Sequence, residues 1–158
     1  MIFVDDNQKL FHLQNEHISY IFRVMEDTGV LEQLYFGERI PHQEDYRFLI
    51  EREIRPSNNL VEGSQLTSLE HIKQEVPSFG TTDFRYPAIE IEYESGDRIS
   101  QFQYHSYRII NGKSVEGTLP GTFGDSNQVE QLEVKLKDRY SDLYLYLTLS
   151  LIHISERA

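Results

Sequence analysis

The chain has 158 residues, with 26 Asp or Glu and 15 Lys or Arg, so its formal net charge is −11 at pH 7. This length is typical of one domain, and an apolar content of 39% is too high for a disordered chain. So acidic a chain lacks the basic face that binds a nucleic-acid backbone or an anionic membrane. We therefore expect a soluble globular domain with neither partner.

The sequence contains no cysteine, which excludes a disulfide scaffold, a cysteine-ligated zinc and a thiol nucleophile. Asp5 and Asp6 stand where a secretory signal would be basic. The most apolar stretch, Leu143 to Ile152, is shorter than the ~18 residues of a membrane helix. These features predict a cytoplasmic protein.

Apolar and polar residues alternate with a period of two in many short segments, which is typical of half-buried β-strands. Turn residues separate the segments, as in a β-sandwich rather than a helical or α/β domain. The segments are residues 9–13, 18–24, 30–36, 89–94, 99–109, 132–136 and 143–149. The sequence therefore predicts an all-β fold, an antiparallel β-sandwich.

Local signals predict the connections between these segments. Thr28-Gly29 indicates a hairpin turn between the second and third segments, and Ser95-Gly96-Asp97 indicates another between the fourth and fifth. Residues 68–75 predict about two turns of helix, which Pro77 would end. We expect this to be the one short helix of the domain.

Gly112-Lys113-Ser114 has the end of a phosphate-binding loop. That motif needs a glycine at position 107, where the chain has Tyr107. The pair Asn111-Gly112 after an alternating strand is better explained as a turn in which glycine supplies a positive φ. No phosphate site is expected.

The histidines show no spacing that would ligate a metal on a helix or on alternate strand positions. His71 and Glu75 are four residues apart on the expected helix, which predicts a surface pair rather than ligation. We therefore expect neither a metal nor another cofactor. The six histidines are His12, His17, His42, His71, His105 and His153.

Neighbouring acids are candidates for general acid and base chemistry. In so acidic a chain, most of them are expected to be solvated. Glu51 stands apart because the apolar residues 48–50 and Ile54 flank it and could hold it near packed structure. The candidates are Asp5-Asp6, Glu44-Asp45 and Glu51-Arg52-Glu53.

Ten tyrosines and nine phenylalanines could line a sugar-binding platform. Tyr144 and Tyr146 alternate with leucines in the last predicted strand. This alternation favours a place on the second face of a buried sheet over a sugar platform.

Two stretches carry more than a pattern: SLE at residues 68–70 with QEVPSFGTTDFRYPA at 74–88, and YRIINGK at 107–113 with LPGTF at 119–123. They resemble the signature segments of the N-terminal domain of glycoside hydrolase family 36, the bacterial α-galactosidases. The resemblance extends over nearly the whole chain. Ser114 and Gly121 depart from the proline and alanine that are usual there, which affects loop detail.

The resemblance implies a large β-sandwich (a supersandwich) that precedes a catalytic (β/α)₈ barrel. The enzymes of this family release terminal α-linked galactose from raffinose- or melibiose-type sugars with retention of configuration. Two aspartates of the barrel act as nucleophile and acid/base. The chain would then be a truncated form, the sandwich without its barrel, with no catalytic residue and no activity of its own.

The resemblance also implies a role for Glu51. Some tetrameric members send an acidic residue from this domain into the sugar pocket of a neighbouring subunit, and Glu51 lies at the matching position. It is therefore the candidate substrate-binding residue. Asp83 and Arg85, within the DFR run, are expected to form a structural clamp.

The last residues depart from the family. After Ser150 the alternation slips at Leu151-Ile152, and residues 151–158 resemble a translated sequencing adapter. We expect the native domain to occupy residues 1–150 and the tail to be non-native. The alternative function for the whole chain is a stand-alone β-sandwich that binds carbohydrate or protein without catalysis.

Overall fold

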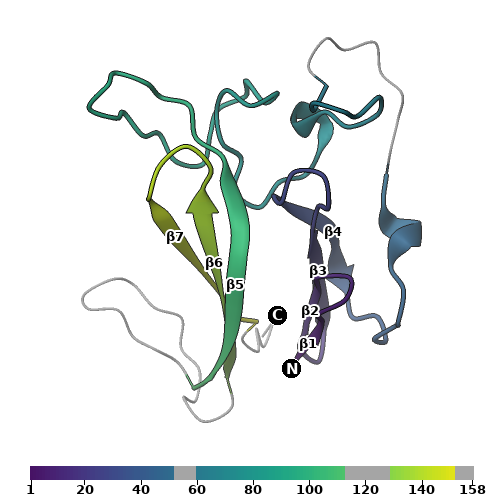
Figure 1. Cartoon of the computed structure of the whole chain (residues 1–158). Coiled ribbons are helices and arrows are strands. Elements are labelled where there is room, and N and C mark those ends of the chain that lie inside the picture. Colours follow the sequence, from purple (N-terminus) through teal and green to yellow (C-terminus); the bar gives the residue numbers. More distant parts are fainter. Residues whose placement is uncertain (52–59, 113–128, 152–158) are drawn as a thin grey trace, which may run out of the picture.

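Seven strands and two short 3₁₀ helices make up the computed structural model, which describes residues 1–51, 60–112 and 129–151 (Figure 1). All strand pairs are antiparallel, so the predicted all-β antiparallel fold is confirmed. The elements are β1 (Ile2–Asp5), β2 (Leu10–Gln14), β3 (Ile18–Val24), β4 (Leu31–Glu38), η1 (Arg47–Leu49), η2 (Leu69–His71), β5 (Phe102–Asn111), β6 (Glu130–Asp138) and β7 (Tyr144–Leu149).

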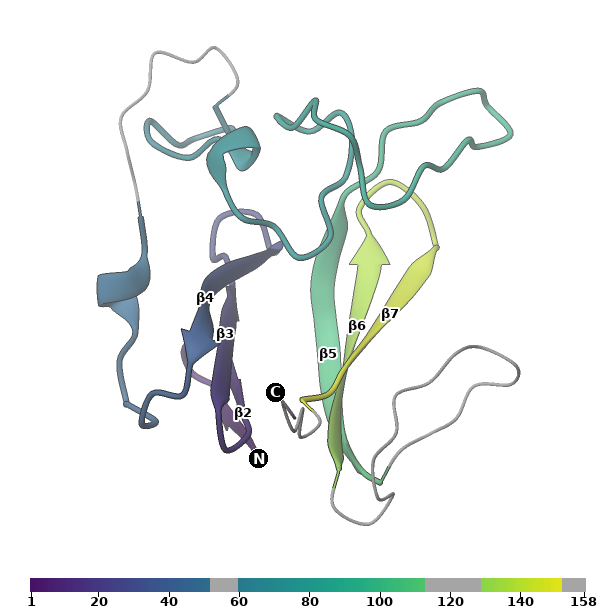
Figure 2. The same cartoon turned by 180° about the vertical axis from the view of Figure 1, so that it is seen from behind.

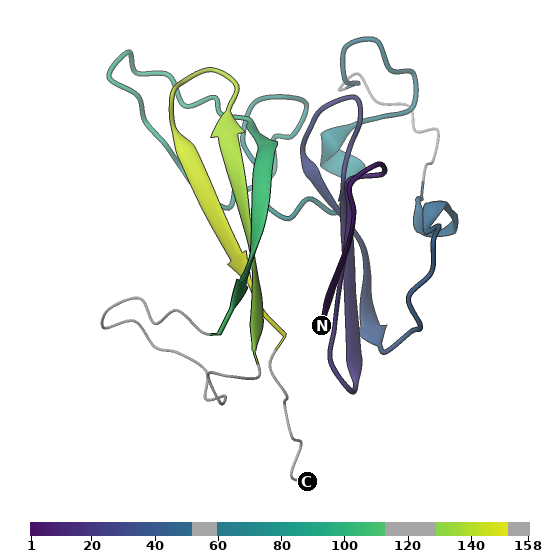
Figure 3. The same ribbon diagram turned by 60° about the horizontal axis from the view of Figure 1, so that its bottom comes forward.

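The strands form two sheets that lie face to face. The first sheet has the order β1-β2-β3-β4 and the second the order β5-β6-β7. Figures 1 and 2 show them as separate layers from opposite sides, and Figure 3 shows the same two layers from below. Every neighbour in each sheet is also a neighbour in sequence, so each sheet is a simple meander.

The core between the sheets follows from the alternation of each strand. Phe11 of β2 lies opposite Phe22 of β3, and their rings stack with centroids 4.8 Å apart. Leu132 and Val134 of β6, both fully buried, approach them from the second sheet. Side chains alternate between the two faces of a strand, so every second residue of each strand points into the interior. These inward residues are apolar and form the core between the sheets.

A second apolar cluster lies on the opposite face of the first sheet. Leu10, Ile21 and Leu34 meet Tyr46 there. Tyr46 belongs to residues 39–50, which we call the covering segment and which include η1. Figure 1 shows this segment in blue, on the side of the first sheet that faces away from the second. The first sheet is therefore buried on both faces.

The hairpin between β3 and β4 joins the two sheets at their upper ends. Gly29 in its turn has a φ of 73°, as predicted for Thr28-Gly29. The Tyr104 backbone amide of β5 donates to the Gly29 carbonyl oxygen at 2.7 Å, and Gln103 Nε2 donates to the Thr28 carbonyl oxygen at 2.7 Å. A Cβ on Gly29 would lie 3.3 Å from Gln103 Cβ, so this approach favours glycine.

The hairpin predicted from residues 89–94 and 99–109 is wrong. A turn does form, with the Gly96 amide donating to the Tyr93 carbonyl oxygen at 2.8 Å, but residues 89–94 are not a strand. β5 begins at Phe102 and pairs with β6 instead. An isolated two-stranded ribbon is marginal, so the longer β5–β6 ladder determines the fold.

The helix predicted over residues 68–75 is also wrong beyond one turn, because η2 ends at His71. The next residues pair with β4: the Gln33 amide donates to the Lys73 carbonyl oxygen at 2.8 Å, and the Glu75 amide to the Leu31 carbonyl oxygen at 3.1 Å. Backbone groups taken by a strand are not available to a helix, so tertiary pairing overrides the local signal.

Some predictions concern residues outside the described ranges, namely 52–59, 113–128 and 152–158. They include Arg52 and Glu53, the LPGTF segment and most of the tail. Gly112 is described and has the expected positive φ, 92°. The boundary between a native domain at 1–150 and a non-native tail stays a prediction.

We predict that Leu132→Ala lowers the free energy of unfolding by about 2–5 kcal/mol, because it leaves a cavity between the sheets. Tyr146→Ala, which truncates a side chain that is 54% exposed on β7, serves as the control; it should cost less than about 1 kcal/mol. Urea titration followed by circular dichroism measures both. Equal midpoints for the two variants would contradict a shared core between the sheets.

Candidate functional site

Glu51 directly follows the covering segment, and its side chain is 84% exposed. Its Oε2 atom lies 3.9 Å from Nζ of Lys73. A shallow hollow beside it is lined by residues from three segments that are distant in sequence: Glu32, Gln33 and Leu34 of β4, Leu49 and Glu51, and His71, Ile72 and Lys73. The structure therefore brings Glu51 beside His71 and Lys73, which sequence reasoning did not place together.

The hollow offers both hydrogen-bond acceptors and donors. Glu51 supplies a carboxylate, and Lys73 supplies an ammonium group that is 65% exposed. Beneath them Arg23 Nε donates to Glu32 Oε2 at 2.9 Å, which neutralises the buried Glu32 carboxylate. A rim of this kind suits a ligand rich in hydroxyl groups, provided that a second surface encloses it.

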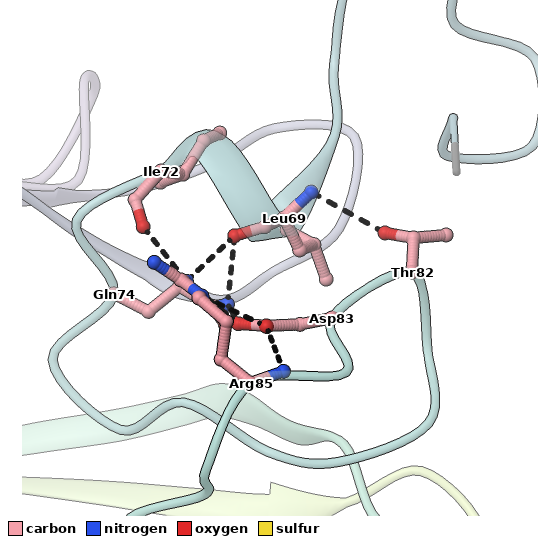
Figure 4. A network of polar contacts seen from close by, with 6 residues as sticks. All are labelled: Leu69, Ile72, Gln74, Thr82, Asp83 and Arg85. Atoms are coloured by element: carbon pink, nitrogen blue, oxygen red, sulfur yellow. Dashed lines mark hydrogen bonds and ion pairs between the residues drawn. The ribbon is translucent and has the colours of Figure 1, made fainter. Parts of the chain in front are cut away.

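A clamp formed by Asp83 and Arg85 fixes the turn that carries His71 and Lys73 (Figure 4). Arg85 makes a two-pronged contact with Asp83, Nε to Oδ1 at 2.9 Å and Nη2 to Oδ2 at 2.7 Å. Its Nη2 atom also donates to the carbonyl oxygens of Leu69 at 3.0 Å and Ile72 at 3.2 Å. Leu69 begins η2 and Ile72 directly follows it, so Arg85 binds the backbone at both ends of this turn.

Gln74 completes the clamp from the other side. Its Nε2 donates to Asp83 Oδ2 at 2.7 Å and to the Leu69 carbonyl oxygen at 3.1 Å, while the Leu69 amide donates to Thr82 Oγ1 at 3.3 Å. Figure 4 shows the contacts of Gln74, Asp83 and Arg85 gathered below η2 and the bond to Thr82 at its side. The expected structural role of Asp83 and Arg85 agrees with this geometry, because neither carboxylate oxygen is left to a ligand.

The electrostatics of the clamp follow from its burial. Asp83 is 1% exposed. Burial alone would raise the pKa of its carboxyl group, but hydrogen bonds from Arg85 and Gln74 outweigh burial and lower it. The same contact raises the pKa of the Arg85 guanidinium. The pair is therefore charged at neutral pH and stays so into the acid range.

Glu75 has an environment that sequence reasoning missed. It was expected to pair with His71 on a helix, but η2 ends at His71. Glu75 instead accepts a hydrogen bond from the Tyr20 hydroxyl, and burial raises the pKa of its carboxyl group against that bond. The same contact, together with burial, raises the pKa of Tyr20. No local pattern in the sequence predicts this pair, because Tyr20 lies on β3, far from Glu75 along the chain.

The other acidic candidates serve the local structure or face solvent. Asp5 Oδ1 accepts the amides of Asn7 at 2.8 Å and Gln8 at 3.1 Å, and so closes the turn after β1. Asp45 pairs with Arg47 at 2.7 Å on the exposed surface. In residues 1–51, 60–112 and 129–151, no three His, Asp or Glu side chains are grouped so as to hold a metal ion.

The tyrosines of β7 are not on a buried face of the described chain, contrary to the favoured interpretation. Tyr144 is 43% exposed and Tyr146 is 54% exposed. Lys135 of β6 lies over both rings, with Nζ 4.1 Å from the centroid of Tyr144 and 5.6 Å from that of Tyr146. The second sheet thus has one buried face and one face of aromatic and charged residues.

A cleft of about 440 Å³ lies in the long connection before β5. Aromatic and apolar residues line most of it, and the ion pair between Arg98 and Glu92, 2.6 Å, lies at its side.

The part of the chain that the structure describes contains no helix that is both long and apolar enough to cross a membrane.

The profile of the "Glycosyl hydrolase family 36 N-terminal domain" matches residues 29–156, which is most of the chain. The chain belongs to this family. The match includes the Asp83–Arg85 clamp, the strands β4 to β7 and Glu51, so the resemblance noted in the sequence is confirmed.

Known relatives are several times longer than this chain. The "Probable alpha-galactosidase C" of Aspergillus oryzae is 35% identical over an alignment of 150 residues, and the match covers 90% of this chain and 18% of that protein. The crystal structure of the α-galactosidase from Lactobacillus brevis superposes with a TM-score of 0.88 at 35% identity, over 96% of this chain and 20% of that one.

A third relative was crystallised with a sugar. AgaA A355E D548N from Geobacillus stearothermophilus, a GH36 α-galactosidase in complex with raffinose, superposes with a TM-score of 0.80 at 31% identity, over 92% of this chain and 20% of that chain. This chain therefore spans about a fifth of the length of the relatives that it matches.

We predict that Asp83→Asn lowers the free energy of unfolding by about 1–3 kcal/mol. The loss is moderated because Arg85 is 45% exposed. Because the pKa of Asp83 is lowered in the fold, its contribution is complete above the pKa of the unfolded chain, about 3.9, and disappears as the pH falls through the folded value.

Urea titrations between pH 3 and pH 7 measure the free energy of unfolding of Asp83→Asn and of the unchanged chain. Asp45→Asn is the matched control, because Asp45 makes the same contact with an arginine two residues on, but at the surface. Its effect on stability should be clearly smaller, because solvent screens an exposed pair. A stability of Asp83→Asn equal to that of the control would show that the clamp does not hold the turn.

Proposed function

We propose that this chain is the N-terminal β-sandwich of an enzyme that hydrolyses terminal α-linked galactose from raffinose- or melibiose-type oligosaccharides. The observation that carries the proposal is the family match over residues 29–156, combined with a chain that spans about a fifth of its α-galactosidase relatives. The raffinose complex of AgaA supports the substrate class.

The catalytic groups belong, in this proposal, to the part of the enzyme outside this chain. A retaining glycosidase needs two carboxyl groups about 5–5.5 Å apart on either side of the scissile bond. Among the described residues, acids such as Asp83, Glu92 and Glu133 are paired with arginines. The sandwich then acts as a scaffold for the barrel and for oligomer assembly, and it is inactive alone.

Glu51 is, in the same proposal, an edge of the sugar pocket of a neighbouring subunit in a tetramer. Its exposure of 84% and its place on a rim with Lys73 support a contact across an interface rather than a closed site within the chain. A carboxylate at such an edge accepts hydrogen bonds from sugar hydroxyl groups. These bonds are stronger than those to a neutral acceptor, because the carboxylate is charged.

The enzyme obtained by reading the source locus past codon 150 tests this role. We predict that Glu51→Gln raises KM for raffinose roughly tenfold with little change in kcat, because a charged hydrogen bond contributes about 1.5–3 kcal/mol to binding. Glu44→Gln, an exposed acid of the covering segment, is the control and should leave KM unchanged. An unchanged KM in Glu51→Gln would exclude the substrate contact.

A second function, a non-catalytic carbohydrate-binding module, is favoured by the exposed Tyr144 and Tyr146. Titration calorimetry of the 158-residue chain with raffinose and with galactose distinguishes the two. We predict no saturable heat up to millimolar sugar, because the pocket is completed elsewhere. Saturable binding that Tyr146→Ala removes would favour the module.

A further inference from the structure

His12 is buried at the centre of the contact between the first sheet and the covering segment. It lies on β2, on the face away from the core between the sheets, and is 0% exposed. A buried histidine needs a partner for each ring nitrogen. Both nitrogens of His12 have such partners, one on the sheet and one on the covering segment.

The donors and acceptors around His12 suit one arrangement of its neutral form. The Gln43 amide donates to the Tyr46 hydroxyl at 2.8 Å, and that hydroxyl donates to His12 Nδ1 at 2.9 Å. His12 Nε2 then carries the proton and donates to Ser19 Oγ at 3.0 Å, which also accepts the Ile40 amide at 3.0 Å. A neutral His12 therefore completes a chain of hydrogen bonds from Gln43 to Ile40.

A second proton on His12 would charge a buried ring whose hydrogen-bond partners in the described chain, Ser19, His42 and Tyr46, carry no negative charge. It would lie at Nδ1, which faces Tyr46 and is 3.2 Å from Nδ1 of His42, whose ring stacks on Phe3 at 4.3 Å. The titratable or charged groups that act on His12 are His42 and Tyr46 from the covering segment and the N-terminal ammonium group of Met1. The contribution of β3 is the uncharged Ser19.

We propose that His12 is a positioning residue: in its neutral form it holds the covering segment on the first sheet, and its protonation releases that segment. Glu51 directly follows the segment, so the latch sets the place of Glu51 and makes it dependent on pH. The part that concerns Glu51 rests on the proposed function, whereas the latch itself depends only on contacts within this chain.

The direction of the pH effect follows from the burial. Burial, then His42, then the N-terminal ammonium lower the pKa of His12 from 6.5 to about 4. A released His12 regains its ordinary affinity for the proton, so the released state binds more protons between these two values. The segment is therefore held fully above about pH 6.5 and is released progressively as the pH falls toward 4.

Amide hydrogen exchange of the 158-residue chain, followed by NMR, tests the latch directly. The amides of Ile40 and Gln43 donate into the network, so their protection factors report its opening. We expect these factors to fall about tenfold per pH unit between about pH 6.5 and 4. The amides of the β3 and β6 ladders should stay much more strongly protected than those of Ile40 and Gln43 over this range. Equal protection factors in the ladders and in the segment would replace release of the segment by global unfolding.

His12→Asn is the decisive variant, because the asparagine oxygen can still accept the Tyr46 hydroxyl but cannot titrate. Its Ile40 and Gln43 amides should lose the pH dependence, whereas His105→Asn, at an exposed position on β5, should keep it. Equal slopes in His12→Asn and in the unchanged chain would overturn the proposal.

A second measurement keeps the proposal testable if His12→Asn does not fold. The ring of His12 in the unchanged chain should titrate near pH 4, with its proton on Nε2 at neutral pH. A midpoint near 6.5, or a proton on Nδ1, would overturn the latch. Both measurements use no sugar, so their failure is distinct from an unchanged KM in Glu51→Gln.

Discussion

The first sheet is apolar on both faces, and the arrangement of the molecule follows from the need to cover each of them. One face supplies Phe11, Phe22 and their neighbours to the core shared with the second sheet. The other supplies Leu10, Ile21 and Leu34, which no sheet covers and on which Tyr46 packs. An apolar face of this size must be removed from water for the sheet to be stable. The covering segment, which contains only the short helix η1, is therefore kept in a fixed position.

The same constraint determines the surroundings of Glu51. Glu51 gains a defined place because the segment before it is packed and hydrogen-bonded, while its own side chain remains in solvent. Lys73, its neighbour across the hollow, also has a defined position. The Asp83–Arg85 clamp binds the backbone around η2, and the residues that follow pair with β4. The two residues meet through two unrelated structural devices.

Sequence reasoning succeeded where the signal was local. Alternation in β3, β4, β6 and β7 and the glycine of Thr28-Gly29 were sufficient to predict those elements, and the DFRYPA run was sufficient to identify the family. It failed where a partner distant in sequence decided the outcome. Residues 89–94 alternate as a strand does, but they form no strand in the structure. Residues 73–75 are not helical, because their backbone groups bind β4 instead.

The same reason explains what was missed around the candidate site. The apolar residues beside Glu51 were the reason to select it as a candidate. Its pairing with Lys73, however, requires that η2 end at His71, whereas the sequence predicted a helix through residue 75. The buried His12 was counted among histidines that bind no metal, and nothing in its own strand indicates that Tyr46, 34 positions away, would become its partner. Polar pairs formed across elements leave no periodic signal in either element.

The separation in sequence between the two sheets also has a consequence for how the chain is made. One polar link between them, from the Tyr107 hydroxyl to Asp6 Oδ1, joins residues 101 positions apart. On a ribosome that adds roughly 5–20 residues per second, β6 emerges about 5–20 s after β4 is complete. During that interval the inner face of the first sheet, with Phe11, Phe22 and Leu31, lacks the buried residues of β6, so the nascent chain leaves part of an apolar surface uncovered that a chaperone would recognise.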